Sequence, residues 1–360
     1  MKVPYWQVEM GNHIPELVKE VAASRSFSMG RYVVEFENSI SKLFPTKYSI
    51  AVTSGSDSIL ISLLALGVGK GDKVLVQDRS WISAGNAVAL LGATPIFVDV
   101  EEALPVISLI DLKDKYSKDC KALIVVHMNG RHSSFEKVID FCEQMELPII
   151  EDAAQAIGSK MNGKFLGTFG AVGCFSLSIA KLIGSGQGGF CVTDNEQIFQ
   201  TLRLMRIQGT LDPFAAKWES IGFNFRLTDF HAAIATNQLN FLSHRIERTI
   251  EIYKRYESRL ALNSKVSLIT LDFASGEVGP YIEAMVKTER NALVEFASSR
   301  GVEIRPFYPS ISKALHLRGI GATPNANMFA KQGIYLPSGP AITDEQIDYV
   351  CDQIFNYFGK

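Results

Sequence analysis

The chain has 360 residues, of which 47% are hydrophobic and 21% are charged, so it can bury a sizeable core and is not intrinsically disordered. Its 36 basic and 38 acidic residues give a net charge of −2, and this balance lacks the basic excess that is typical of nucleic-acid-binding proteins. At roughly 150 residues per domain, the length suggests about two domains.

The cysteines and histidines argue against several kinds of site. The five cysteines are widely spaced and no two form a C-x-x-C pair, which argues against a disulfide framework or a zinc site and favours a reducing compartment. The six histidines form no H-x-x-x-H array, so we expect no metal site built from protein side chains. Because the start, MKVPYWQVEMGNH, is not of signal-peptide type and no apolar stretch approaches about 18 residues, we expect a cytoplasmic protein without a membrane-spanning helix.

The first 245 residues alternate short apolar runs with longer amphipathic stretches. Strands that are apolar almost throughout are typical of a parallel sheet covered by helices on both faces, and strand–helix–strand repetition implies α/β architecture. Helices are predicted at 56–68, 84–91 and 134–146. Strands are predicted at SIAVTS (49–54), KVLVQ (73–77), TPIFVDV (94–100), ALIVVH (122–127), LPIIED (147–152), AVGCFSLS (171–178) and GGFCVTD (188–194).

The second part of the chain has a different pattern. The amphipathic stretch at 227–262 predicts one or two helices, and we place a domain boundary near its middle, around residue 245. The remainder, 246–360, has fewer apolar runs and predicts a smaller α+β domain. Its last segment, 343–358, predicts a helix that begins with a capping box formed by Thr343 and Gln346.

Two segments at predicted strand ends suggest a ligand site, because ligands of open α/β sheets lie beyond the carboxyl ends of the strands. The segment 54–58, Ser-Gly-Ser-Asp-Ser, opens a helix, where free N–H groups and the helix dipole bind an anion; the alternative is an ordinary N-cap. Glu151 and Asp152 end a strand, and a carboxylate there either faces the ligand or caps a helix.

Other candidates are single residues, each with a simpler structural alternative. Lys181 lies in a weakly charged stretch, and a desolvated lysine can form a Schiff base, whereas a surface lysine has no such role. Trp81 either stacks on a flat ligand or fills the core, and His127 is readily explained as a satisfied core histidine. Asn224 and Arg226 precede a long helix and are either helix caps or ligand contacts.

The glycines at 184, 186 and 189 spell G-x-G-x-x-G. A dinucleotide fingerprint needs a helix that opens within the glycines, but a strand-like run, GFCVTD, follows here. We therefore reject a nicotinamide or flavin site and expect these glycines to allow a tight turn or a close backbone approach.

In combination and in order, these motifs resemble those of the pyridoxal-phosphate-dependent sugar aminotransferases of the DegT/DnrJ/EryC1/StrS type. The resemblance runs from MGRYVVEFE (29–37) through TSGSDSILISLLALGVGKGDKVLV, LGATPIFVDV, IIEDAAQAIGS, LGTFGAVGCFSLSIAK, GQGGFCVTD and GFNFRLTDFHAA to YLPSGPAITDEQIDYV (335–350). It implies an aspartate-aminotransferase-like fold (fold type I), with a large cofactor-binding domain over 1–245, built on a mostly parallel sheet, and a small C-terminal domain over 246–360.

The resemblance also implies a role for each matching residue. Lys181 is similar to the lysine that forms the Schiff base with pyridoxal 5′-phosphate, and Asp152 to the carboxylate that partners the pyridine nitrogen. Trp81 is similar to the aromatic residue that stacks on the ring, and Gln155 to the residue near the phenolic oxygen. The phosphate is expected at Gly55, Ser56, Asp57 and Ser176, with Asn224 reaching it from the neighbouring subunit of a homodimer that shares its active sites.

The implied reaction is a ping-pong transamination. L-glutamate converts the cofactor to pyridoxamine 5′-phosphate, and a keto-deoxy-sugar nucleotide then accepts the amine, for O-antigen, surface polysaccharide or a glycosylated natural product. Arg226, Arg305 and Tyr308 are expected near the sugar nucleotide. The chain departs from the family pattern at Ser178 and Ala180, and at HMNG (127–130), where H-L-Y-G is usual.

Three alternatives stay open at this point. A sugar-nucleotide dehydratase resembles this family but has histidine in place of the Schiff-base lysine, so the lysine at position 181 argues against it. A regulatory or binding protein on the same fold is the non-catalytic alternative, and formation of an aromatic amine from a cyclic keto acid is a minor one. The sequence leaves open the sugar, the nucleotide and the aminated carbon.

Overall fold

The larger part of the structure is built on a seven-stranded sheet in the order β1-β9-β8-β5-β4-β2-β3. Its five strands β3, β2, β4, β5 and β8 pair in parallel, and only β9 runs antiparallel to its neighbours β1 and β8. The computed structural model describes residues 1–212, 217–317 and 319–359. The bounds are β1 (Tyr48–Val52), β2 (Lys73–Gln77), β3 (Thr94–Val98), β4 (Cys120–Val126), β5 (Ile149–Asp152), β8 (Val172–Ser176) and β9 (Gly189–Thr193).

All seven predicted strands are present, each within a few residues of its predicted bounds, and the mostly parallel α/β architecture is confirmed. Side chains alternate between two apolar layers along each strand, as Leu123 and Ile124 of β4 do. One face is covered by α2 (Arg31–Leu43), α6 (Phe135–Gln144) and α8 (Asp229–Leu239), and the other by α3 (Gly55–Ala65), α4 (Ser83–Leu90) and α7 (Glu196–Arg206). Both faces are buried, which explains why the strand sequences are apolar throughout.

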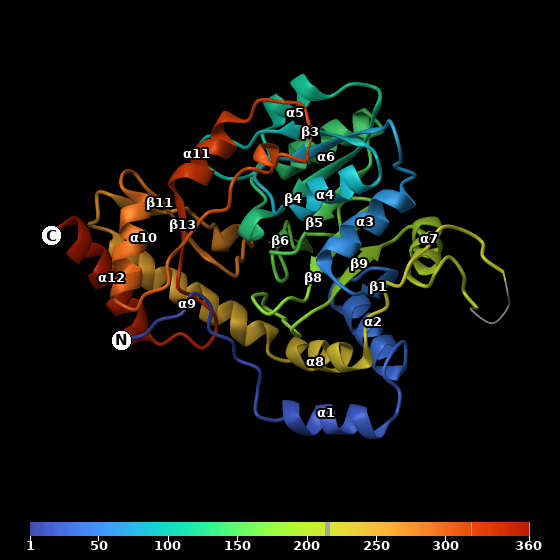
Figure 1. Ribbon diagram of the computed structural model, residues 1–360, viewed down its shortest axis with the longest axis horizontal. Coiled ribbons are helices and arrows are strands. Elements are labelled where there is room, and N and C mark those ends of the chain that lie inside the picture. Colours follow the sequence, from blue (N-terminus) through green and yellow to red (C-terminus); the bar gives the residue numbers. More distant parts are fainter. Residues whose placement is uncertain (213–216, 318, 360) are drawn as a thin grey trace.

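The smaller part is an antiparallel sheet in the order β10-β11-β13-β12, with helices packed against it (Figure 1). Its α+β character agrees with the prediction, and the capping box of Thr343 and Gln346 is present at the start of the last helix. Its elements are α9 (Leu242–Leu260), β10 (Val266–Leu268), β11 (Ile282–Val286), α10 (Arg290–Ser299), β12 (Arg305–Pro306), α11 (Pro324–Gln332), β13 (Gly333–Leu336) and α12 (Asp344–Phe358).

The first residues of the chain lie with the smaller part, so that both chain ends are close to it in Figure 1. Val3 forms a parallel bridge with Val302 and belongs to the apolar core of this part, and Trp6 forms a bridge with Ser338.

The predicted division at residue 245 falls inside α9 and stays a prediction. The other elements are α1 (Ile14–Ala23), α5 (Leu109–Lys115) and a hairpin of β6 (Lys160–Met161) and β7 (Lys164–Phe165). Among the described residues, no helix has the length and hydropathy needed to cross a lipid bilayer.

The glycine-rich segment before β9 brings the start of α3 close to the sheet, as the sequence predicts. A Cβ atom on Gly189 would lie 2.4 Å from the carbonyl carbon of Ser54, where only a residue without a side chain fits. Gly186 and Gly188 have φ angles of +91° and +137°. No helix opens within these glycines, because Gly189 begins β9, and the rejection of a dinucleotide fingerprint is confirmed.

Replacement of Gly189 by alanine is therefore expected to lower the free energy of unfolding by about 1–3 kcal/mol, because the new methyl group forces the Ser54 backbone to move. Gly69→Ala is the matched control, since a Cβ atom there meets open space, and it should change stability by less than about 0.5 kcal/mol. Urea unfolding of both variants measures the difference. Equal stability of the two variants would show that α3 does not depend on this close approach.

Candidate active site

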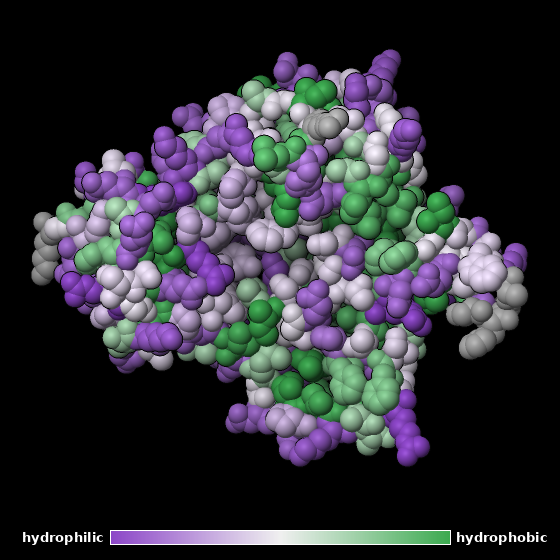
Figure 2. Space-filling view, viewed as in Figure 1, coloured by the Kyte–Doolittle hydropathy of each residue, from purple (hydrophilic) through white to green (hydrophobic). Residues whose placement is uncertain are grey.

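A cavity of about 490 Å³ opens where the carboxyl ends of the central strands meet the smaller part. Figure 2 shows the surface hollowed near the middle of the view, where the two parts of the structure meet. The larger part contributes the end of β5, the end of β8, the start of α3 and the loop after β2. Of the predicted residues, the cavity is lined by Gly55, Ser56, Trp81, Asp152, Gln155, Ser176, Lys181, Arg305 and Tyr308.

Lys181 reaches the cavity from the turn that follows β8. The turn is closed by a hydrogen bond from the Lys181 backbone N–H to the carbonyl oxygen of Ser178 at 3.0 Å. Its Nζ donates a hydrogen bond to Tyr281 Oη at 3.2 Å. The side chain is thus partly enclosed and is not the freely exposed surface lysine of the alternative interpretation.

Asp152 is the last residue of β5 and is only 5% exposed. Burial raises the pKa of its carboxyl group, while a hydrogen bond from the Ala154 amide and the charges of Lys181 and His127 act in the opposite direction. Oδ1 accepts the Ala154 N–H at 3.1 Å. A positive charge in this cavity, such as a protonated ring nitrogen, would favour the ionised form of this carboxyl group.

Glu151 points to the opposite face of the sheet, because side chains alternate along a strand. Its carboxylate accepts the N–H groups of Gly167, Phe169 and Gly170 at 2.7, 2.6 and 2.6 Å. His127 Nε2 lies 2.8 Å from Glu151 Oε2, and both side chains are almost fully buried. His127 is thus a satisfied core histidine, and of the two acidic residues only Asp152 faces the cavity.

The start of α3 forms a cradle for an anion. N–H groups in the first turn of a helix have no partner within the helix, and Gly55 and Ser56 occupy these positions and line the cavity. A Cβ atom on Gly55 would lie 2.9 Å from Ser176 Cβ, so Ser176 approaches the start of this helix closely. Asp57 does not line the cavity: its amide donates to the N-cap oxygen of Ser54 at 3.1 Å.

Two further predicted side chains line the same cavity. Gln155 Oε1 accepts the Asn129 backbone N–H at 2.9 Å, which fixes the direction of its amide group. Trp81 is 54% exposed at the cavity edge, with its ring edge-on to Tyr308 at 5.3 Å between centroids, so it does not fill the core. The indole leaves a flat aromatic face available to a ligand.

Asn224 and Arg226 lie outside this cavity. They belong to an irregular segment before α8, and Arg226 Nε donates to Asn224 Oδ1 at 2.8 Å. Three tyrosines without a predicted role also line the cavity, from the smaller part and the chain start: Tyr5, Tyr281 and Tyr335. Tyr5 and Tyr281 lie in none of the motifs, and Tyr335 opens the motif at 335–350 without a predicted role. Only the packing of distant segments brings the three side chains to the site.

The residues of the cavity fit pyridoxal 5′-phosphate by their chemistry. The helix start and Ser176 suit a phosphate, the buried carboxylate suits a ring nitrogen that carries a proton, and Lys181 supplies an amine for the aldehyde. A flat aromatic side chain, Trp81, suits a planar ring. The fold and this set of groups define a pyridoxal-phosphate-dependent enzyme.

Comparison with known sequences identifies the family. Residues 8–355 match the DegT/DnrJ/EryC1/StrS aminotransferase family. The chain is 31% identical over 359 residues to a GDP-perosamine synthase of Escherichia coli O157:H7, a match that covers 99% of this chain and 98% of the relative. It is 29% identical to a pleiotropic regulatory protein of Geobacillus stearothermophilus, covering 96% and 95% of the two chains. The protein therefore belongs to the DegT/DnrJ/EryC1/StrS aminotransferase family.

Solved structures agree with this assignment. DesV of S. venezuelae, solved in complex with a ketimine intermediate, superposes with a TM-score of 0.94 at 26% identity. The match covers 100% of this chain and 99% of the DesV chain. GDP-4-keto-6-deoxy-D-mannose-3-dehydratase of E coli, with bound hydrated PLP, superposes with a TM-score of 0.91 at 24% identity, covering 98% and 99%. The predicted family, fold and cofactor are confirmed.

Burial of Asp152 predicts how the cofactor-free protein responds to pH. The folded-state pKa lies above the ordinary value of 3.8, so stability falls as pH rises from that value through the folded pKa. Asp152→Asn, which carries no charge, is therefore expected to be more stable than the wild type at pH 8 and to lose this advantage at acidic pH. Thermal unfolding of the cofactor-free proteins across pH measures it.

The matched control for this prediction is Asp119→Asn. A hydrogen bond with Lys73 lowers the pKa of this exposed carboxyl group. The substitution should therefore make the protein slightly less stable than the wild type at pH 8, the opposite of the change expected for Asp152→Asn. An Asp152→Asn protein that is less stable than the wild type at pH 8 would contradict the prediction.

Proposed function

We propose that the protein transfers an amino group from L-glutamate to the keto group of a deoxy sugar carried on GDP. The observation that carries the proposal is the pairing of Lys181 and Asp152 in one cavity, in a chain of this aminotransferase family. The relatives named GDP-perosamine synthase, from Escherichia coli O157:H7 and Vibrio cholerae, are each 31% identical over at least 92% of this chain, and they support a GDP-linked keto sugar as substrate.

When bound, pyridoxal 5′-phosphate supplies an electron sink for the carbon that bears the amino group. Asp152 would hold the positive charge at the ring nitrogen, because its carboxylate lies in a desolvated site where an opposite charge stabilises it. The amides of Gly55 and Ser56 and the hydroxyl of Ser176 would bind the phosphate, and Trp81 would cover one face of the ring.

Lys181 would carry the cofactor and, once the substrate amine displaces it, move the proton at the substrate α-carbon. General acid–base catalysis needs such a group within hydrogen-bond reach of the proton, and Lys181 lines the cavity together with these groups. Gln155, whose Oε1 accepts the Asn129 backbone N–H, would lie near the phenolic oxygen of the ring. Arg305 and Tyr308 lie at the wall formed by the smaller part, where we place the sugar nucleotide.

Lys181→Ala tests the core of this proposal. The purified wild type is expected to be yellow and to convert GDP-linked keto sugars and glutamate into an amino sugar and 2-oxoglutarate. The variant is expected to lose the visible absorbance and at least about 10³-fold of the activity. Absorbance spectra and mass spectrometry of products from GDP-, UDP- and dTDP-linked keto sugars provide the measurements. A colourless wild type that takes up no cofactor would contradict the proposal.

The same mass spectra distinguish the alternatives. A deoxy-keto product without nitrogen would indicate a dehydratase, although the lysine at position 181 argues against that reaction. Cofactor uptake without turnover of any keto-sugar nucleotide would favour a regulatory role like that of the Geobacillus stearothermophilus relative. A cytoplasmic location stays a prediction, supported by five free cysteines.

We further propose a homodimer in which Asn224 binds the phosphate in the site of the partner subunit. Asn224 lies outside the cavity of its own chain, in a segment where Trp218, Ile221 and Phe223 are 70%, 81% and 66% exposed. Exposed apolar residues that cluster in this way support an interface. Figure 2 shows a second apolar area between α1 and α8, which supports an extended contact.

Mixing two inactive variants tests the shared site. If Asn224 acts across the interface, a hybrid of one Lys181→Ala chain and one Asn224→Ala chain contains one intact site. Random exchange of subunits is then expected to restore about a quarter of the wild-type activity. If Asn224 acted within its own chain, both sites of the hybrid would be defective and mixing would restore nothing. Activity after denaturation and joint refolding, with each variant refolded alone as control, gives the answer.

A further inference from the structure

The tip of Lys181 is held by a side chain from the smaller part. Its Nζ donates a hydrogen bond to Tyr281 Oη at 3.2 Å and lies 5.4 Å from the centre of the Tyr281 ring. Tyr281 comes directly before β11 and is only 8% exposed. Because lysine has a flexible four-carbon stem, a fixed acceptor at its tip restricts the positions that the nitrogen can take.

The Tyr281 ring is itself fixed by three aromatic neighbours. Trp6 and Tyr335 meet it edge-on, with centroids at 5.7 and 5.5 Å, and Tyr5 stacks on it at 6.3 Å. Edge-to-face and stacked contacts favour defined ring orientations. The phenol oxygen therefore has a set direction toward the lysine.

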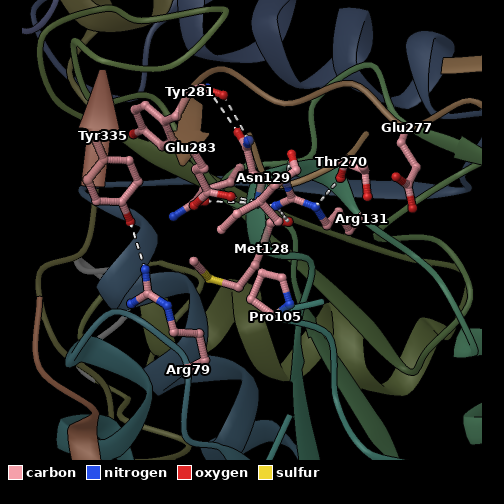
Figure 3. Close-up of polar contacts among 12 residues, drawn as sticks. Arg79, Pro105, Met128, Asn129, Arg131, Thr270, Glu277, Tyr281, Glu283 and Tyr335 are labelled. Carbon is pink, nitrogen blue, oxygen red and sulfur yellow. Dashed lines mark hydrogen bonds and ion pairs between the residues drawn. The ribbon is translucent and has the colours of Figure 1, made fainter. Parts of the chain in front are cut away.

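The backbone of Tyr281 is held by Asn129. Asn129 Nδ2 donates to the carbonyl oxygen of Tyr281 at 2.8 Å, and Asn129 Oδ1 accepts the Tyr281 N–H at 2.9 Å. Figure 3 shows this pair of dashed contacts between the two residues. The backbone N–H of Asn129 also donates to Gln155 Oε1, so one residue contacts both Tyr281 and Gln155, which line the cavity.

Asn129 is in turn placed by a buried anchor between the two parts. Arg131 donates to Glu283 of β11 at 2.5 Å and to the carbonyl oxygens of Thr270 and Ile269 at 2.8 and 3.0 Å. The Arg131 and Glu283 side chains are fully buried. The loop around Asn129 is thus bound on the sheet of the smaller part next to Tyr281 (Figure 3).

From these contacts we propose that Tyr281 is a further catalytic residue, whose hydroxyl holds Lys181 Nζ for proton transfer, and that Asn129 is the positioning residue that sets Tyr281. This role rests on the proposed function, because it concerns the lysine that carries the cofactor. Proton transfer requires the donor and acceptor atoms within a narrow geometry, which a single hydrogen bond at the lysine tip supplies. The H-M-N-G sequence at 127–130 provides the asparagine where the related family has tyrosine.

Tyr281→Phe removes only the hydroxyl and tests the catalytic role. The variant is expected to lose about 10-fold or more in kcat while KM for glutamate stays within about twofold. A second measurement needs no turnover: the cofactor-free protein is mixed with pyridoxal 5′-phosphate, and the growth of visible absorbance reports its capture by Lys181. Capture is expected to be about 10-fold slower, with the same final absorbance.

Tyr349→Phe is the matched control, since it removes a hydroxyl that donates to the carbonyl oxygen of Arg300 far from the cavity. It should leave kcat and the capture rate unchanged.

Asn129→Gly tests the positioning role, because glycine keeps the left-handed backbone at φ 52° while losing both side-chain contacts to Tyr281. This variant should lower both kcat and the rate of cofactor capture. Because Asn129 acts through Tyr281, the double variant should lie within about twofold of Tyr281→Phe in both rates.

Three results would overturn the assignment. A Tyr281→Phe protein with wild-type kcat and capture rate would show that the hydroxyl is not needed, while the proposed function would stand. If the thermal midpoint of Tyr281→Phe falls far enough to account for its losses of kcat and capture rate, the hydroxyl has a structural role instead. Additive effects of the two substitutions would show that Asn129 does not act through Tyr281. Failure of the wild type to take up any cofactor would remove the proposed function itself.

Discussion

The site depends on a carboxylate that is held out of water at the end of a parallel strand. Asp152 occupies this position because β5 lies in the middle of the sheet, covered by helices on both faces, and its side chain emerges where the strand stops. A buried negative charge is costly without a positive partner, and this cost favours binding of a cationic ring. The start of α3 is brought to the same cavity by two close approaches, of Gly55 to Ser176 and of Gly189 to Ser54, and Lys181 lines that cavity as well.

Much of the larger part could be predicted from the sequence for a physical reason. Strands buried on both faces are short apolar runs, and each run here matches a strand of the sheet. Asp152 and Gly55 follow from the same logic, because they stand at a strand end and a helix start where ligands bind, whereas Ser176 follows only from the resemblance to the family. The reversed direction of β9 was not predicted, since an apolar run carries no signal of strand direction.

The wall formed by the smaller part could not be predicted in this way. Tyr5, Tyr281 and Tyr335 are separated by more than 50 residues from one another and share no motif, so only the folded chain shows that they meet. The ion pair of Arg131 and Glu283 could not be predicted either. Each residue alone indicates a charge at the surface, but in the folded chain they contact each other and both side chains are fully buried. H-M-N-G was visible as an unusual sequence, but its contact with Tyr281 was not.

The first six residues have a practical consequence for anyone who handles this protein. Val3 and Trp6 form bridges to the smaller part, and Tyr5 stacks on Tyr281 and lines the cavity. An affinity tag joined to Met1, or a cleavage scar left there, will therefore sit within a few residues of the reacting groups. Purification handles belong after α12, whose last residue, Phe358, lies at the opposite terminus and outside the cavity lining.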